Sequence, residues 1–213
     1  MKNNGTANKV TKIIEEIFNS LSHGLGAIAA LIGLIIVLLT RSTAGSFKLG
    51  FIIYSSSLIS LMTVSALYHA LKFSRANNVF RVLDHCSIFL LIAGSFTPFI
   101  IKLYQGWAQS LLLLSVWLLA ATGISVTAAV VMPRAMRKTG ASLYIVFGWL
   151  GLFLIPKLGL LNASVGRLVL AGGILYTLGT ILFAIKKPFM HVGWHFFVIA
   201  AAAVQYLAIL KLA

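Results

Sequence analysis

The sequence predicts an all-α integral membrane protein, a bundle of seven transmembrane helices preceded by a short amphipathic interfacial helix. Of its 213 residues, 60% are hydrophobic and only 9% are charged, and the mean hydropathy is +1.02. Soluble domains carry about 25% charged residues, so this composition indicates a membrane protein. No stretch alternates apolar and polar residues with a period of two, which argues against a β-barrel.

Seven apolar stretches define the expected spans, at residues 23–40, 48–71, 82–102, 109–132, 141–156, 166–185 and 191–211. Most approach the roughly 20 residues that a helix needs to cross a bilayer. The fifth stretch is short and ends at Pro156, which makes it the weakest of the seven. Because the connections are short, we expect residues 1–213 to form a single domain, with residues 1–22 as its cytoplasmic tail and amphipathic helix.

The segment before the first span has the period of an amphipathic helix. Its apolar residues recur at helical spacing, and Lys12, Glu15 and Glu16 take the other face; the apolar set is Val10, Ile13, Ile14, Ile17, Phe18 and Leu21. This pattern predicts a helix lying on the cytoplasmic surface of the membrane. The alternative is a polar tail that shows this period by chance. Residues 1–21 lack a basic tip followed by an apolar core, so we expect no signal peptide.

The net charge of +14 is distributed unevenly along the chain. When each Lys and Arg is assigned to its nearest connection, 11 fall on the side of the N-terminus and 6 on the other side. Positive charge is in excess on the cytoplasmic side of membrane proteins, so we expect a cytoplasmic N-terminus. We interpret the basic residues as topology anchors that face anionic membrane lipids, with no nucleic-acid partner.

The five histidines share one predicted end of the bundle with the one acidic residue near a span. His69 ends its span, and the others begin theirs; these are His23, His85, His191 and His195, with Asp84 beside His85. With the N-terminus inside, this end is cytoplasmic. Polar side chains are costly within a membrane, so this cluster indicates a functional site. For Asp84 the structural alternatives are a helix cap or a pair with Arg81.

The motif His191-Val-Gly-Trp-His195 puts two imidazoles on one helix face, because residues four apart lie above one another. His69 supplies a third nitrogen if the second and seventh spans are neighbours. Three nitrogens with one open position are typical of catalytic zinc, whereas structural zinc takes four protein ligands. Imidazole also suits copper, iron and nickel. The alternative is a set of interfacial histidines that bind no metal.

Further polar residues accompany this motif. Ser65 lies one turn deeper than His69 on the same helix face. His85 follows Asp84 directly and points about 100° away from it, so we expect a structural or supporting role. His23 stands among small residues, where helix packing with a hydrogen bond is expected. Cys86 is the single cysteine and cannot form an internal disulfide.

Motifs across nearly the whole chain resemble the signatures of the bacterial hemolysin III family. They are Glu15-Glu16-Ile17-Phe18-Asn19-Ser20 with Ser22-His23-Gly24, Ser65-Ala66-Leu67-Tyr68-His69, Leu83-Asp84-His85, Ala93-Gly94-Ser95-Phe96-Thr97-Pro98-Phe99 and His191-Val192-Gly193-Trp194-His195. This family is related to the progestin and adiponectin receptors and, more distantly, to alkaline ceramidases.

The resemblance implies seven helices around a cytoplasm-facing zinc site in the bacterial inner membrane. It implies zinc ligation by His69, His191 and His195. For Asp84 it implies a contact to the metal through water. For Ser65 it implies a supporting role beside the ligands or hydrogen bonding to an oxyanion.

The residues favour a zinc-dependent hydrolase acting on a lipid amide or ester. Asp84 would accept a proton from water and pass it to the leaving group, and Ser65 would donate to the oxyanion. The alternative is a non-enzymatic sensor of membrane state with structural zinc. A cytolytic pore of the hemolysin type is less favoured, because the polar residues cluster at one end and do not cross the bilayer.

Overall fold

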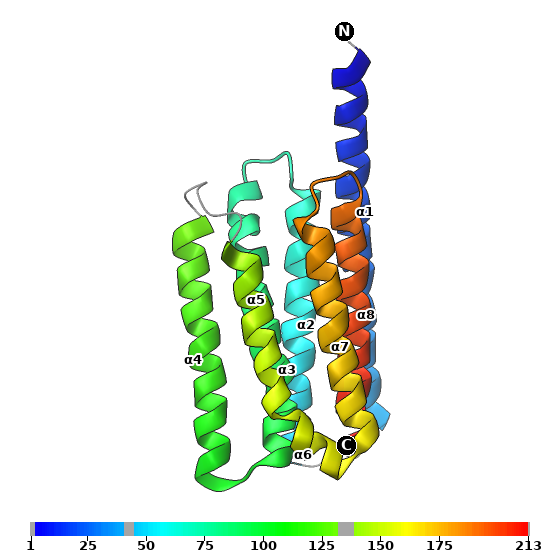
Figure 1. The fold of residues 1–213 in the computed structure, drawn as a ribbon. Helices are drawn as coiled ribbons and strands as arrows, with labels where there is room; N and C mark the ends of the chain where they lie inside the picture. The colour runs from blue at the N-terminus through cyan, green and yellow to red at the C-terminus, as the bar shows by residue number, and fades with distance from the viewer. Residues whose placement is uncertain (1–2, 41–44, 132–138, 213) are drawn as a thin grey trace.

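The computed structural model describes residues 3–40, 45–131 and 139–212, and this part of the chain consists of helices joined by short connections (Figure 1). The helices are α1 (Asn3–Thr40), α2 (Ser46–Ala70), α3 (Asn77–Leu103), α4 (Gly106–Val131), α5 (Thr139–Trp149), α6 (Ile155–Leu161), α7 (Ala163–Ala184) and α8 (Met190–Leu210). In the described residues, six helices are long and apolar enough to span a membrane, and the bent pair formed by α5 and α6 makes seven when counted as one span. The predicted all-α membrane bundle is therefore confirmed.

The outer surface of the bundle is apolar. Large side chains such as Leu25, Ile32, Leu114 and Ile181 are exposed on the outer helices. A continuous surface of this kind would promote association in water, but it matches the hydrocarbon of a bilayer. Helices suit this environment because each satisfies its own backbone hydrogen bonds. The protein is therefore a multi-pass membrane protein.

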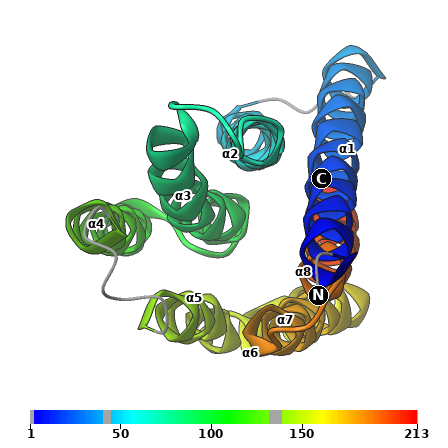
Figure 2. The ribbon, with the colours of Figure 1, turned by 90° about the horizontal axis from the view of Figure 1, so that it is seen from above.

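Seen from above, the helices are arranged in a ring (Figure 2). α2 lies between α1 and α3, while α4 packs on the outside of α3. α5 contacts both α3 and α7, and α8 packs against α7 and α1, which closes the ring. As successive spans run in opposite directions, α2 and α7 end, and α3 and α8 begin, at one end of the bundle, which we call the histidine end.

The fifth span differs from the expected continuous helix over residues 141–156. α5 ends at Trp149, a turn of 3₁₀ helix follows at Leu150–Phe153, and α6 begins at Ile155. The two parts of this span are bent by 43°. Pro156 lies in the first turn of α6, where its missing N–H breaks no intrahelical hydrogen bond. The proline therefore starts the next helix instead of marking the end of the span.

The amphipathic segment does not form a separate helix on the membrane surface. α1 is continuous from Asn3 to Thr40, since no proline interrupts it, and its first turns project past the other helices (Figure 1). Ile17 and Leu21 are exposed, whereas Asn19 and His23 are buried against the bundle. The expected amphipathic pattern is present, but Glu15 and Glu16 of its polar face contact residues at the histidine end, while Lys12 stays exposed.

Candidate metal centre

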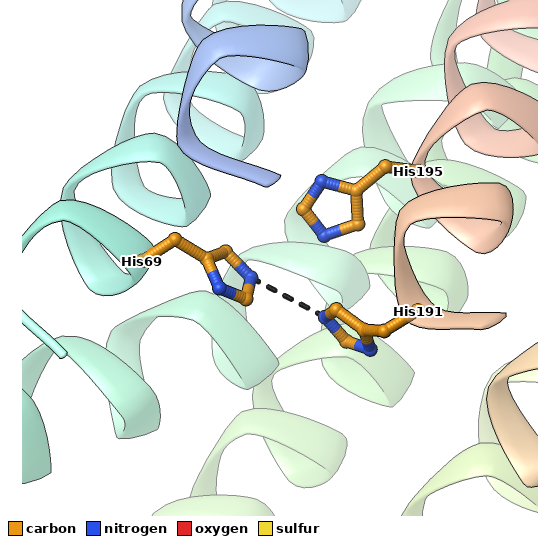
Figure 3. Close-up of side chains that lie close together, drawn as sticks. All are labelled: His69, His191 and His195. Carbon is orange, nitrogen blue, oxygen red and sulfur yellow. Dashed lines mark hydrogen bonds between the residues drawn. The ribbon is translucent and has the colours of Figure 1, made fainter. Parts of the chain in front are cut away.

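The three histidines predicted to bind metal converge at the histidine end. His69 lies in the last turn of α2, and His191 and His195 lie in the first two turns of α8. Their rings point toward one another (Figure 3), with ring centroids 5.1, 4.9 and 4.9 Å apart. One nitrogen from each ring lies within 4.8 Å of the other two. We call these three residues the histidine cluster.

The separation of the ring nitrogens fits a metal ion. Nε2 of His69 and Nε2 of His191 are 3.3 Å apart. Two nitrogens that each lie about 2.0–2.1 Å from a tetrahedral zinc are about 3.3–3.4 Å from each other. His69 and His195 are buried, and His191 is half-buried. The cluster could therefore hold a metal ion at a site that is largely shielded from solvent.

Glu16 of α1 orients His69. Its Oε2 lies 2.6 Å from Nδ1 of His69, and its Oε1 lies 3.5 Å from Nζ of Lys72. A carboxylate at Nδ1 keeps the proton on that nitrogen, which leaves the lone pair of Nε2 available to a metal. Since Nε2 is the atom that faces His191, Glu16 selects the tautomer that metal binding requires.

Ser22 of α1 has a matching position beside His195. Its hydroxyl donates to the backbone oxygen of Asn19 over 3.0 Å, so it can accept a hydrogen bond from Nδ1 of His195, 3.3 Å away. The lone pair then resides on Nε2 of His195. Within the described residues this buried nitrogen has no hydrogen-bond partner. Buried polar atoms without partners are rare and costly, and a metal ion would satisfy this one.

The contribution of α1 to the site was not predicted from the sequence. The pattern placed Glu15 and Glu16 on the outer face of a surface helix, whereas the structure turns them inward. Glu15 accepts a hydrogen bond from the backbone N–H of Phe189, directly before α8. A signal was available, because Glu16, Asn19 and His23 are spaced by three and four residues and so share one face of a helix.

Ser65 and Asp84 are buried and line one cavity inside the ring of helices. Ser65 lies one turn before His69 on α2, as the spacing predicts. Asp84 lies about two turns inside α3, so the alternative that it caps its own helix is wrong. Its Oδ2 is 3.7 Å from Nδ1 of His85. The carboxylate is not a member of the histidine cluster itself.

The remaining two histidines lie outside the cluster. His85 is half-buried, and its Nδ1 lies 2.8 Å from the backbone oxygen of Arg81. His23 is only 1% exposed and stacks on His195, with ring centroids 3.7 Å apart and ring planes at 13°. His23 also lines the cavity.

The cavity extends from the histidine end deep into the bundle. Its volume is about 160 Å³, and it is lined mostly by apolar side chains of α2, α3, α5, α7 and α8. On α3 the lining residues run in one stripe from Asp84 to Phe99, which corresponds to about 22 Å along the helix axis. The space is therefore long and narrow, with polar groups at the end beside the histidines.

Fold and site together define the class: a multi-pass, all-α membrane protein with a three-histidine cluster that could hold a metal ion. Residues 11–206 match the family described as Haemolysin-III related, and the chain belongs to this family. It is 38% identical to Hemolysin-3 of Bacillus cereus over 92% of this chain and 90% of that protein.

More distant relatives occur in animals. The chain is 30% identical to monocyte to macrophage differentiation factor of Homo sapiens, over 75% of this chain and 68% of that protein. It is 28% identical to adiponectin receptor protein of Drosophila melanogaster, over 96% of this chain and 52% of that protein. The relation to the adiponectin receptors that the sequence motifs implied is therefore confirmed.

Proposed function

We propose that this protein is a zinc-dependent hydrolase of lipid amide or ester bonds, with its site at the cytoplasmic face of the bacterial inner membrane. The observation that carries the proposal is one long apolar cavity whose wall contains Asp84, Ser65 and His23, the residue that stacks on His195 of the histidine cluster. The Bacillus relative supports the bacterial setting. The excess of basic residues on the side of the N-terminus supports the orientation.

His69, His191 and His195 would hold the zinc ion. Three neutral imidazoles leave one coordination position open, as in catalytic zinc sites. When bound in such a site, zinc supplies Lewis acidity, which polarises a carbonyl and makes hydroxide available near neutral pH. Glu16 and Ser22 would keep two of the three ligands in the required tautomer.

Asp84 and Ser65 would supply the acid–base and hydrogen-bonding groups. Asp84 offers the one carboxylate among the cavity-lining residues that the structure describes, so it would accept a proton at Oδ2 and later return it to the leaving group. The Ser65 hydroxyl, one turn below His69, would donate to the oxygen that becomes negative when the carbonyl is attacked. Both side chains are buried, which strengthens such interactions.

The cavity supports a lipid as the substrate. Its lining is mostly apolar, and no Lys or Arg side chain of the described residues lines it. An engineered apolar cavity of about 150 Å³ binds benzene, so the 160 Å³ here has room for a segment of an acyl chain. The same lining disfavours a water-filled pore, the function that the name of the Bacillus relatives would suggest.

The first test asks whether zinc is present. We expect one zinc per chain in the purified protein, and we expect its loss in His191→Ala and His195→Ala, because these replacements remove ligands from a three-ligand site. The measurement is metal analysis by mass spectrometry. Zinc content that is unchanged in both variants would refute the assigned ligands.

The second test addresses turnover. We expect fatty-acid release from a panel of ceramides and glycerolipids by the zinc-loaded protein. Asp84→Asn should keep zinc and lose this activity, because the amide cannot accept the proton. Ser65→Ala should lose less, at most about 10²–10³-fold for one oxyanion donor. Release by Asp84→Asn at the wild-type rate would refute the acid–base role of Asp84. Release from no lipid above a metal-free blank would leave structural zinc in a non-enzymatic sensor as the function.

A further inference from the structure

A second polar site lies deep in the cavity, far from the histidine cluster. Gln205 of α8 is 8% exposed and lines the cavity. It lies ten residues after His195, so it is about 15 Å further along the helix axis. Tyr176 of α7 lines the cavity as well, and its hydroxyl oxygen is buried.

Gln205 and Tyr176 lie on α8 and α7, which pack side by side (Figure 1). The Gln205 amide lies directly over Gly172 of α7, where a Cβ atom would come within 2.7 Å of its Nε2. Tyr176 is one turn from Gly172 on the same helix face. Because Gly172 has no side chain, the Gln205 amide can occupy the space above it.

Each of the two side chains has one polar atom without a partner. Nε2 of Gln205 donates to the backbone oxygen of Val169 over 3.2 Å, which fixes the orientation of the amide and leaves Oε1 free. Among the described residues, neither Oε1 of Gln205 nor the hydroxyl oxygen of Tyr176 has a hydrogen-bond partner. Unsatisfied polar groups at membrane depth are costly, and such groups usually mark a functional site.

The two free groups are complementary to a hydroxyl. The Tyr176 hydroxyl can donate, and Oε1 of Gln205 can only accept. A ligand hydroxyl can accept from the first and donate to the second, whereas a carbonyl could satisfy only the tyrosine. No Lys or Arg among the described residues lines the cavity, and Asp84 lies at its other end. A charged group therefore has no counter-ion at this depth.

We propose that Tyr176 and Gln205 form a binding site for a hydroxyl group in the middle of a lipid acyl chain whose head lies at the histidine end. The inference rests on the proposed function in that the cavity must accept an acyl chain. It adds a substrate class: hydroxylated acyl chains are preferred over saturated, unsubstituted ones. A plain alkyl chain would leave both polar groups unsatisfied.

Binding can test this without any turnover. The protein, purified with its metal retained, is titrated with stearate and with stearates that carry one hydroxyl at successive mid-chain carbons, each displacing a fluorescent fatty acid. We expect at least one hydroxylated isomer to bind about three- to tenfold more tightly than stearate, the gain of about one net hydrogen bond. Equal affinity for stearate and every isomer would overturn the proposal and would indicate that water occupies the site.

Two variants and a control localise the preference. Tyr176→Phe and Gln205→Leu should each abolish the preference for the hydroxylated isomer, while stearate should bind at least as tightly as to the wild type. The control is Ser95→Ala, because Ser95 also lines the cavity but already donates to the backbone oxygen of Leu91; it should keep the preference. A preference that survives in Tyr176→Phe and Gln205→Leu would refute the site.

The hydrolase and the hydroxyl-binding site can each be refuted without refuting the other. A hydroxyl preference without fatty-acid release from any lipid would support the binding site and refute the hydrolase. Fatty-acid release without a hydroxyl preference would refute the binding site alone. If neither stearate nor any isomer displaces the probe, the cavity does not take acyl chains and the inference fails.

Discussion

Glu16 lies outside the histidine cluster but hydrogen-bonds to one of its members. Its carboxylate touches His69 and reaches Lys72, so it links α1 to the last turn of α2. Partners of this kind fix both the tautomer and the orientation of a metal-binding imidazole. With zinc bound as proposed, the Glu16 side chain would act on metal affinity through His69.

At this scale we predict that Glu16→Ala lowers the affinity for zinc by about 10–100-fold, the usual effect of removing such a partner. Glu16→Gln should lose less, because its amide oxygen can still accept the hydrogen bond from Nδ1. The measurement is competition with a zinc chelator of known affinity. If Glu16→Ala competes as well as the wild type, Glu16 does not position His69.

The members of the histidine cluster and their hydrogen-bond partners differ in how far the sequence predicts them. His191 and His195 are separated by one turn, so their shared face follows from helix geometry alone. His69 required the assumption that α2 and α8 meet. Glu16 could not be assigned, since an acidic residue on an amphipathic helix is ordinarily solvated, and only the docking of α1 shows which face turns inward.

α2 and α3 pack closely at Gly94, a residue of α3 without a side chain. A Cβ atom added at Gly94 of α3 would lie 2.8 Å from Cβ of Ser57 on α2. Small residues commonly allow membrane helices to approach in this way. This contact matters for the site, because α2 carries Ser65 and His69 and α3 carries Asp84.

We therefore predict that Gly94→Ala destabilises the protein by about 1–3 kcal/mol, the range for overpacking a tight interior. The matched control is Gly148→Ala in α5, where nothing lies within 4 Å of the added Cβ; it should be neutral or stabilising by up to about 1 kcal/mol. Thermal unfolding in detergent measures both. Equal melting temperatures for the two variants would contradict the packing argument.

The helices themselves were predicted well from apolar length, because a bilayer requires about 20 apolar residues for each span. Their ends were predicted less well. Pro156 marked the fifth span as unusual, but the sequence did not reveal that α6 starts there after a bend. The course of α1 was also missed, since an amphipathic period looks the same whether its apolar face meets lipid headgroups or the hydrocarbon beside a bundle.

Over the whole molecule, the histidine cluster is a link between helices that are distant in sequence. His69 and His191 are 122 positions apart, and α2 and α8 belong to opposite halves of the chain. A metal that binds only the folded arrangement stabilises it by mass action. The stability of the bundle should therefore depend on metal.

We predict that chelation lowers the melting temperature of the wild-type protein in detergent. A gain of about 2.7 kcal/mol accompanies a free ligand at 100 times its dissociation constant, and this gain is lost on stripping the metal. His69→Ala serves as the control, because its melting temperature should already be low and should not respond to chelation. An unchanged melting temperature of the wild type after complete metal removal would show that the ion is peripheral.

Because the members of the histidine cluster are far apart in the sequence, they enter the membrane at different times during synthesis. Chains emerge from the ribosome N-terminus first, so Glu16 and His69 are inserted long before His191 and His195, which begin the last helix. Until α8 enters the membrane, the nascent chain offers a metal one imidazole from this cluster, too few for a stable complex. We therefore expect metal binding to be the last step of assembly. A bound ion would show that α8 has been inserted.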